Sequence, residues 1–291
     1  MRPIVPAFFG LSVLFAAGAA CVPPGNSTPT DAGPAAASSA AAMMLHNSPG
    51  ALTMPFEDNF DRAGASGGMV GPKDGAEPPT VATAHLHEDG SGEASLETDA
   101  AEIDEELGPS WTQIGTHVWH IEDGWLCGSN AHNHGVWLNK VLPVNTRIEW
   151  EAKADSNDGD LKAELWGDGK SAATGISYTN ATSYLTILGG WHNTLHVLAR
   201  LNEHGTDRRE IRVDKDSDDP RQKPVARGQI YHFKVERADG KTIRWSIDGI
   251  DMLNWADQKP LGGIGHDHFG FNDWEVKVCF DNVKITPLTS M

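Results

Sequence analysis

Residues 231–247 read Tyr-His-Phe-Lys-Val-Glu-Arg-Ala-Asp-Gly-Lys-Thr-Ile-Arg-Trp-Ser-Ile. Apolar side chains take alternate positions on both sides of the Asp-Gly pair, namely Tyr231, Phe233, Val235, Ile243, Trp245 and Ile247. A period of two is typical of a β-strand with one buried face, and Asp-Gly favours a tight hairpin turn. The stretch therefore predicts two antiparallel strands that present one apolar face to a core.

The same alternation recurs along the chain. It is found at residues 56–60, 119–126, 148–152, 161–165, 195–201 and 276–285. No segment of ten or more residues has a convincing helical period. Many short strands with one apolar face each need a second sheet to cover that face. The predicted fold is therefore all-β, a two-sheet antiparallel sandwich.

The N-terminus is typical of an export signal. Residues 1–20 hold an early arginine and a short apolar run that ends in small residues. Such a run is too short to span a bilayer, and no apolar residues extend it. Gly18-Ala19-Ala20-Cys21 resembles a bacterial lipobox, which implies lipidation of Cys21; an ordinary cleaved signal is the alternative. We therefore expect a secreted protein anchored by lipid to a bacterial membrane, at the outer membrane or cell surface.

Composition divides the rest of the chain. Residues 21–53 are rich in Pro, Ala, Ser and Gly and predict a disordered tether. The domain is expected at 54–288, with an acidic insertion at about 63–106 that cannot bury enough apolar surface to order itself. The formal charge of −17 over 291 residues disfavours nucleic acid as a partner, because phosphates would be repelled.

Two cysteines remain, Cys127 and Cys279, both in strand-like stretches. In an oxidising compartment they can pair only with each other. The sequence thus allows one disulfide across the domain; two buried thiols that never meet are the alternative.

Several phrases are more specific than strand periodicity. They are Phe56-x-Asp58-x-Phe60, Trp119-x-Ile121-x-Asp123-Gly124-x-Leu126, Ile247-Asp248-Gly249 and Phe280-Asp281-Asn282-Val283-Lys284-Ile285. In this order they resemble the concanavalin-like (laminin-G-like) jelly-roll superfamily. Within it they look most like the secreted bacterial domains named after 3-keto-disaccharide hydrolases. The resemblance implies a jelly roll whose concave face or rim loops handle carbohydrate, by binding or by hydrolysis.

Three segments combine a tryptophan with amide and imidazole groups beside glycines: residues 130–137, 189–205 and 265–274. A sugar offers apolar C–H faces and many hydroxyls, so a flat aromatic ring edged by planar polar groups suits it. The alternative for each tryptophan is a place in the core. The candidate ligand-binding residues are Trp137, Trp191, His192, Asn193, Arg200, Glu203, His204, His266, His268, Asn272 and Trp274.

Metal chemistry has weaker signals. His132/His134 and His266/His268 are two residues apart, so each pair would share a strand face and could bind zinc; hydrogen-bonding loop histidines are the simpler interpretation. The resemblance also implies calcium as a candidate cofactor, near Asp58, Asp61 and Asp281, although aspartates that cap turns fit the same pattern.

Hydrolysis needs two carboxylates that flank a glycosidic bond. Asp160 and Glu164 share strand parity, with Lys162 between them, but a charged solvent-exposed face has the same pattern. No catalytic residue is assigned. The sequence favours a surface-anchored carbohydrate-binding domain; a glycoside hydrolase of the 3-keto-disaccharide type and a structural adhesion module are the alternatives. Converging loops would support the first two, whereas the third predicts loops that point apart.

Overall fold

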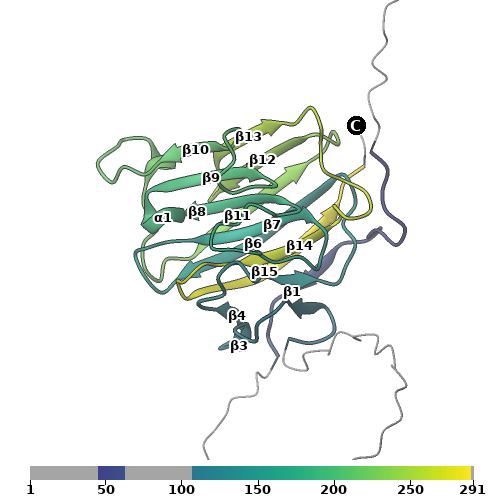
Figure 1. The fold of residues 1–291 in the computed structure, drawn as a ribbon, viewed down its shortest axis with the longest axis horizontal. Helices are drawn as coiled ribbons and strands as arrows, with labels where there is room; N and C mark the ends of the chain where they lie inside the picture. Colours follow the sequence, from purple (N-terminus) through teal and green to yellow (C-terminus); the bar gives the residue numbers. More distant parts are fainter. Residues whose placement is uncertain (1–44, 63–106, 290–291) are drawn as a thin grey trace, which may run out of the picture. The chain divides into compact units, whose positions relative to one another are not determined.

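The computed structural model describes residues 45–62 and 107–289. Within them, strands form an eight-stranded and a seven-stranded sheet in which every pairing is antiparallel. Figure 1 shows the two sheets as layers, with the β6 and β15 layer behind the β7 and β8 layer. The predicted all-β two-sheet sandwich is confirmed.

The strands are named in chain order. The eight-stranded sheet runs β13 (Ile250–Ala256), β12 (Thr242–Ile247), β11 (Tyr231–Arg237), β6 (Thr146–Ala154), β15 (Val278–Pro287), β4 (Trp125–Gly128) and β3 (His120–Glu122), and β1 (Phe56–Asp58) also pairs with β15. The seven-stranded sheet runs β10 (Arg209–Arg212), β9 (Leu195–Arg200), β8 (Tyr184–Gly189), β7 (Leu161–Gly167), β14 (His268–Asn272), β5 (Val136–Leu138) and β2 (Trp111–Gln113). The described helices are short: α1 (Gly190–Asn193) and the 3-10 turn η1 (Pro220–Gln222).

The predicted hairpins are present. In β11 and β12, Phe233 lies opposite Ile247 and Val235 opposite Trp245, so the alternating apolar residues of both strands share the buried face. β3 and β4 are joined by Asp123 and Gly124, whose φ angles of 50° and 77° are the pair of positive values that a type I′ turn requires.

A core of aromatic and aliphatic side chains fills the space between the sheets. Phe271 stacks on Phe280 from the opposite sheet with 4.0 Å between ring centroids, and Trp150 stacks on Phe233 at 4.9 Å. Five tryptophans are at most 1% exposed: Trp111, Trp119, Trp137, Trp166 and Trp245. Most of the tryptophan content therefore serves packing, because each ring removes a large apolar area from water.

A loop at residues 168–183 covers part of the outer face of the seven-stranded sheet. Its Tyr178 and Ala181 form a second apolar cluster with Leu185 and Ile187 of β8 and neighbouring residues of β9. As a result β7 and β8 are buried along their whole length, on both faces. Polar residues on the outer face of β7 are thus enclosed, although alternation alone would place them in solvent.

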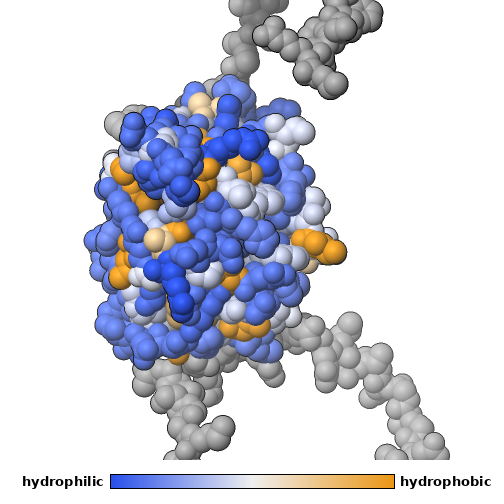
Figure 2. Space-filling view, turned by 90° about the vertical axis from the view of Figure 1, so that its left-hand side faces the viewer, coloured by the Kyte–Doolittle hydropathy of each residue, from blue (hydrophilic) through white to orange (hydrophobic). Residues whose placement is uncertain are grey.

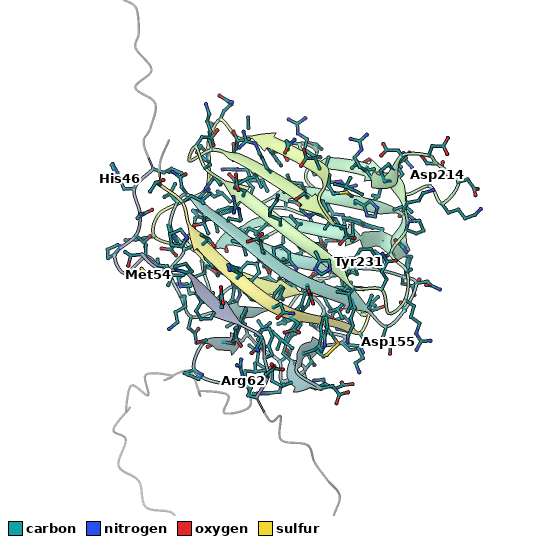
Figure 3. All side chains as sticks on the ribbon, turned by 180° about the vertical axis from the view of Figure 1, so that it is seen from behind. His46, Met54, Arg62, Asp155, Asp214 and Tyr231 are labelled. Carbon is teal, nitrogen blue, oxygen red and sulfur yellow. A yellow bond between two sulfur atoms is a disulfide. The ribbon has the colours of Figure 1, made fainter. Side chains whose placement is uncertain are left out.

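The predicted tether, residues 21–53, ends within the described part of the chain. The backbone N–H of Leu52 donates to the oxygen of Val141, and the Asn47 side-chain oxygen accepts from the N–H of Val144. Figure 3 labels His46 and Met54 along this segment, at the edge of the sandwich. Residues 45–53 therefore belong to the folded domain, a correction to the predicted boundary at 54, because their hydrogen bonds attach them to the strand connections. The predicted signal at 1–20, Cys21 and the insertion at 63–106 lie outside the described residues.

A disulfide joins Cys127 of β4 to Cys279 of β15. The two residues are direct partners in the antiparallel register and their Cα atoms lie 4.1 Å apart. The bond fastens the last long strand to the β3–β4 hairpin. In the part of the chain that the structure describes, no helix has the length and apolar character needed to cross a membrane.

Candidate functional site

A pocket of about 620 Å³ opens at one end of the seven-stranded sheet, where β7 begins and β8 ends. It lies beside α1, at the left-hand end of β8 in Figure 1. This end of the sandwich faces the viewer in Figure 2, where the surface is mostly hydrophilic with separate hydrophobic patches. All three predicted segments contribute to the pocket: Asn130 and Asn133, then Trp191, His192, Glu203 and His204, and finally Trp274.

Two tryptophans supply the aromatic wall. Trp191 and Trp274 are both partly exposed, unlike the core tryptophans. The Arg208 guanidinium carbon lies 4.7 Å from the Trp191 ring centroid, and the His132 ring lies 4.7 Å from that of Trp274. These neighbours restrict the rings while a face or edge of each borders the cavity, which favours a flat apolar ligand surface.

Trp191 owes its position to an unusual backbone turn. Gly189, Trp191, His192 and Asn193 have φ angles of 75°, 53°, 53° and 59°, so α1 is a left-handed turn. Each non-glycine residue in this conformation costs on the order of 1–2 kcal/mol because its Cβ crowds the backbone. Such strain persists only where surrounding contacts over-determine it, and it is common at ligand sites.

Asn193 supplies those contacts. Its side-chain amide donates to the oxygens of Asn157 and Val225 at 2.7 and 2.8 Å, and its Oδ1 accepts from the N–H of Val225 at 3.0 Å. The Thr194 hydroxyl closes the turn by donating to the oxygen of Trp191. Asn193, a predicted ligand-binding residue, thus lies outside the pocket lining and positions the turn that carries Trp191.

Replacing Asn193 with alanine is expected to lower the unfolding free energy by about 1–3 kcal/mol, because two backbone oxygens and one N–H lose their partner. The tryptophan emission spectrum of the protein should also change through the contribution of Trp191, since the turn that carries this residue can then relax. Denaturant titration and tryptophan emission measure the two effects. Asn254→Ala, on an exposed position of β13, is the matched control and should change neither; an unchanged Asn193→Ala variant would contradict the assignment.

Lys162 forms the polar floor of the pocket. Its ammonium donates to Asn133 Oδ1 at 2.7 Å and to Glu203 Oε2 at 3.0 Å, and the side chain is 3% exposed. Burial of the ammonium works against the charged form, but the carboxylates of Asp160 and Glu203 outweigh burial and raise the pKa of Lys162. The lysine is therefore a fixed cation among carboxylates.

Asp160 and Asp273 lie next to this lysine. Asp160 Oδ2 accepts a hydrogen bond from the backbone N–H of Trp274 at 2.8 Å, which fixes the position of Trp274 in the aromatic wall. Asp273 is fully buried, and its Oδ2 accepts the N–H of Ala131. Burial, aided by the negative charge of Asp160, raises the pKa of Asp273 to about 7. The carboxyl of Asp273 can therefore hold a proton near neutral pH.

Glu164 lies two residues after Lys162 in β7 and is enclosed under the 168–183 loop. Its oxygens accept from the Tyr178 hydroxyl at 3.0 Å, the Ser183 hydroxyl at 2.7 Å and the Asn272 amide at 2.7 Å. Burial raises the pKa of Glu164 to about 7 in spite of these donors. Asn272, a predicted ligand-binding residue, is fully buried and orients this carboxyl beside the pocket.

This raised pKa makes stability depend on pH. The folded state holds the Glu164 proton more tightly than the unfolded chain, so the contribution is fully present below pH 4.5 and is lost as pH rises to about 7. Glu164→Gln stays neutral, so its stability relative to the native chain should rise by roughly 2–3 kcal/mol over that window. Urea titrations at several pH values measure this difference. Glu210→Gln, an exposed position on β10, serves as control, and a flat difference for Glu164→Gln would refute the assignment.

Five of the predicted ligand-binding residues line the pocket: Trp191, His192, Glu203, His204 and Trp274. Trp137 is 1% exposed, and its indole N–H donates to the oxygen of Ser171 under the covering loop. Its ring packs where side chains on Gly167 and Gly270 would collide with it. Trp137 is therefore a packing residue outside the pocket.

The remaining predicted residues lie elsewhere. Arg200 pairs with Asp257 at 2.8 Å and donates to the oxygen of Lys259 at 2.8 Å. His266 Nδ1 lies 2.6 Å from the oxygen of Thr182, and His268 Nδ1 lies 2.7 Å from Asp267. These side chains hold loops together and do not border the pocket.

Several of the side chains suggested as metal ligands already have other partners. Asp58 accepts two hydrogen bonds from the Arg62 guanidinium and one from the Trp111 indole, so its oxygens are already engaged. His134 bonds to the oxygen of Ala131, and His132 packs on Trp274. Among residues 45–62 and 107–289, no cluster of three or more histidine, cysteine, aspartate or glutamate side chains is arranged to hold a metal ion.

Two pocket residues, Asn133 and Lys162, and the neighbouring Asp273 were not predicted as ligand-binding residues. All three become buried only when the strand ends and the covering loops assemble. The shared parity of Lys162 and Glu164 was visible in the sequence, and both belong to β7, whereas Asp160 precedes the strand with a φ of 65° and reaches the same pocket as Lys162 from that turn. The signal that distinguishes them from a solvated face is their burial, which the sequence does not contain.

No family of protein sequences matches the chain, and no curated protein matches it. Solved structures that are similar include the carbohydrate-binding module CBM66 from Bacillus subtilis, with 16% identity, a TM-score of 0.44, and coverage of 60% of this chain and 94% of that one. A glycosyl hydrolase from Parabacteroides distasonis, described as putative, has 16% identity, a TM-score of 0.41, and coverage of 62% and 89%. Domain 4 of the extracellular arabinanase AbnA from Geobacillus stearothermophilus, solved with arabinotriose, has 13% identity, a TM-score of 0.39, and coverage of 62% and 82%.

Proposed function

We propose that this domain binds a carbohydrate in the pocket between Trp191 and Trp274. The observation that supports this is the meeting of all three tryptophan-containing segments in one concavity. The pocket joins two aromatic surfaces with amide, imidazole and carboxylate groups, which match the C–H faces and hydroxyls of a sugar. A volume of about 620 Å³ has room for a short oligosaccharide segment.

The convergence also weighs against a structural adhesion module without a small ligand. That alternative predicts loops that point in different directions. Here Asn130, Glu203 and Trp274, which are far apart in sequence, border the same cavity. The loops thus form one site.

A glycan array probed with the full chain tests the proposal. Trp191→Ala should weaken binding of any ligand by about 10- to 100-fold, since removal of an aromatic contact costs roughly 1–3 kcal/mol. Trp125→Ala is the matched control, because Trp125 is partly exposed on β4, contacts Lys153, and lies outside the pocket. Equal losses in both variants, or no saccharide ligand at all, would overturn the proposal.

Hydrolysis is the second candidate, in line with the resemblance to 3-keto-disaccharide hydrolases. The observation that favours it is the group of titratable side chains at the pocket floor, with Asp160 and Glu203 on either side of Lys162. Two carboxyl groups beside a bound sugar are what acid–base cleavage needs. Product analysis of each array ligand separates the two functions: turnover that Asp160→Asn abolishes while binding persists would establish the enzyme.

We also propose that the domain is held at a bacterial membrane by lipid on Cys21. The support is the lipobox-like Gly18-Ala19-Ala20-Cys21 after a short apolar run. Metabolic labelling with a palmitate analogue tests this, with Cys21→Ala as the matched variant. Label that survives the substitution would refute lipidation at this residue.

A further inference from the structure

The charge of the pocket restricts which saccharide it can accept. Six side chains with a formal charge line the cavity: Asp158, Asp160, Lys162, Glu203, Glu275 and Lys277. Four are acids and two are bases. A ligand that enters between the tryptophans therefore meets an excess of negative charge.

Both bases already have carboxylate partners. The Lys162 ammonium is 3% exposed and is held by Asn133 and Glu203. The Lys277 ammonium donates to both oxygens of Glu122 at 2.8 Å. Turning Lys162 towards a ligand carboxylate would leave the buried Glu203 carboxylate without its cation, which is costly. The Lys277–Glu122 pair is exposed and holds its lysine less firmly.

The pocket imidazoles also face carboxylates. His192 Nδ1 lies 4.0 Å from Asp158, and His204 Nε2 lies 3.2 Å from Glu203 Oε1. A positive charge on either ring would thus be paired with a carboxylate of the protein itself. No lining group offers an anionic ligand a cation without an existing carboxylate partner.

Two of the four acids, in contrast, are largely exposed. The side chains of Asp158 and Glu275 are 58% and 56% exposed, and their nearest basic atoms are imidazole nitrogens 4.0 and 3.8 Å away. Asp160 uses one oxygen for the Trp274 N–H. Charge-assisted hydrogen bonds to an ammonium are stronger than neutral ones, and aromatic faces such as those of Trp191 and Trp274 attract cations too.

We propose that the ligand is an amino sugar, a saccharide with a protonated amine, and that the pocket discriminates against uronic acids. The inference rests on the proposed carbohydrate-binding function and adds the substrate class. The ammonium group binds to the carboxylates of Asp158, Asp160 and Glu275 at the pocket mouth. The sugar ring lies against the tryptophans.

The test compares oligosaccharides of equal length that carry positive, neutral or negative groups. Tetramers of glucosamine and galactosamine are compared with their N-acetylated forms and with glucuronate and galacturonate tetramers, by calorimetry with the full chain. The amine form of at least one series should bind about tenfold more tightly than its N-acetylated form, with the advantage shrinking as salt rises. Uronates should bind weakest.

Matched variants locate the effect. Asp158→Asn should reduce the preference for the amine to about two- or threefold. Asp155→Asn, in the same loop but paired with Arg227 outside the pocket, should leave the preference unchanged. Both aspartates are exposed, so neither substitution threatens folding.

The outcomes separate the two proposals. Trp191-dependent binding of neutral or uronate forms, equal to or tighter than the amine, would overturn the charge preference and leave carbohydrate binding intact. An equal effect of the two aspartate variants would remove Asp158 from the site and overturn the assignment. Absence of Trp191-dependent binding to any saccharide would overturn the function on which the inference rests.

Discussion

Replacing Lys162 with methionine is expected to lower the unfolding free energy by roughly 3–5 kcal/mol, because removal of one partner leaves buried charge uncompensated. Methionine fills similar space but provides no donor for Glu203 Oε2 or Asn133 Oδ1. The side chains of Lys162 and Glu203 are only 3% and 8% exposed, so the loss of their contact is felt by a largely desolvated pair. Denaturant titration at pH 7 with linear extrapolation measures the loss.

Two further variants make the Lys162 result specific. Lys162→Met combined with Glu203→Gln should be less destabilised than the sum of the single variants, because the second change removes the stranded charge. Lys215→Met, at a lysine that is 77% exposed and paired with Asp216, should change stability by less than about 1 kcal/mol. Additive losses, or a loss at Lys162 no larger than at Lys215, would show that the pair is not a buried unit.

Removing the disulfide is the second large expected effect. Cys127 and Cys279 are 152 residues apart in sequence, so the bond restricts a long loop in the unfolded chain. Chain-entropy estimates for loops of this length approach 5 kcal/mol, and measured losses are usually about 2–5 kcal/mol. The double variant Cys127→Ala with Cys279→Ala should lose about that much. Alanine is preferred to serine because both sites are buried.

Reductant provides the control for the disulfide. It should lower the stability of the native chain towards that of the double variant and leave the double variant unchanged. Denaturation followed by circular dichroism, with and without reductant, measures both. If reductant does not change the stability of the native chain, and the native chain is no more stable than the double variant, the predicted contribution of the bond is contradicted.

The strands were predictable where local pattern and tertiary environment agree. β6, β11 and β12 each bury one face, so their apolar residues alternate and the period of two is visible. β8 (Tyr184–Gly189) is buried on both faces, one against the core and one under the 168–183 loop. It shows no alternation, and the sequence did not mark it. Enclosure by a loop is a long-range event that leaves no periodic signature.

The candidate site was predictable in part for a related reason. Trp191, His204 and Trp274 occur beside glycines and polar residues, which distinguished them from core tryptophans. Trp137 has the same neighbours but is buried under the 168–183 loop, because two glycines on adjacent strands leave room for its ring. Asn193 also has such neighbours, yet its amide fastens the left-handed turn. Neighbours in sequence do not reveal whether a side chain points into a cavity or into a turn.

The sequence by itself determined the all-β class, the hairpins at Asp123-Gly124 and Asp239-Gly240, and the shared face of Lys162 and Glu164. These depend on backbone alternation and turn conformation, which a few neighbouring residues set. Tertiary structure alone decided which charged residues are buried and which of the three loops' side chains meet. Burial and convergence arise from contacts between segments far apart in the chain, and those contacts give Lys162, Asp273 and Glu164 their electrostatic character.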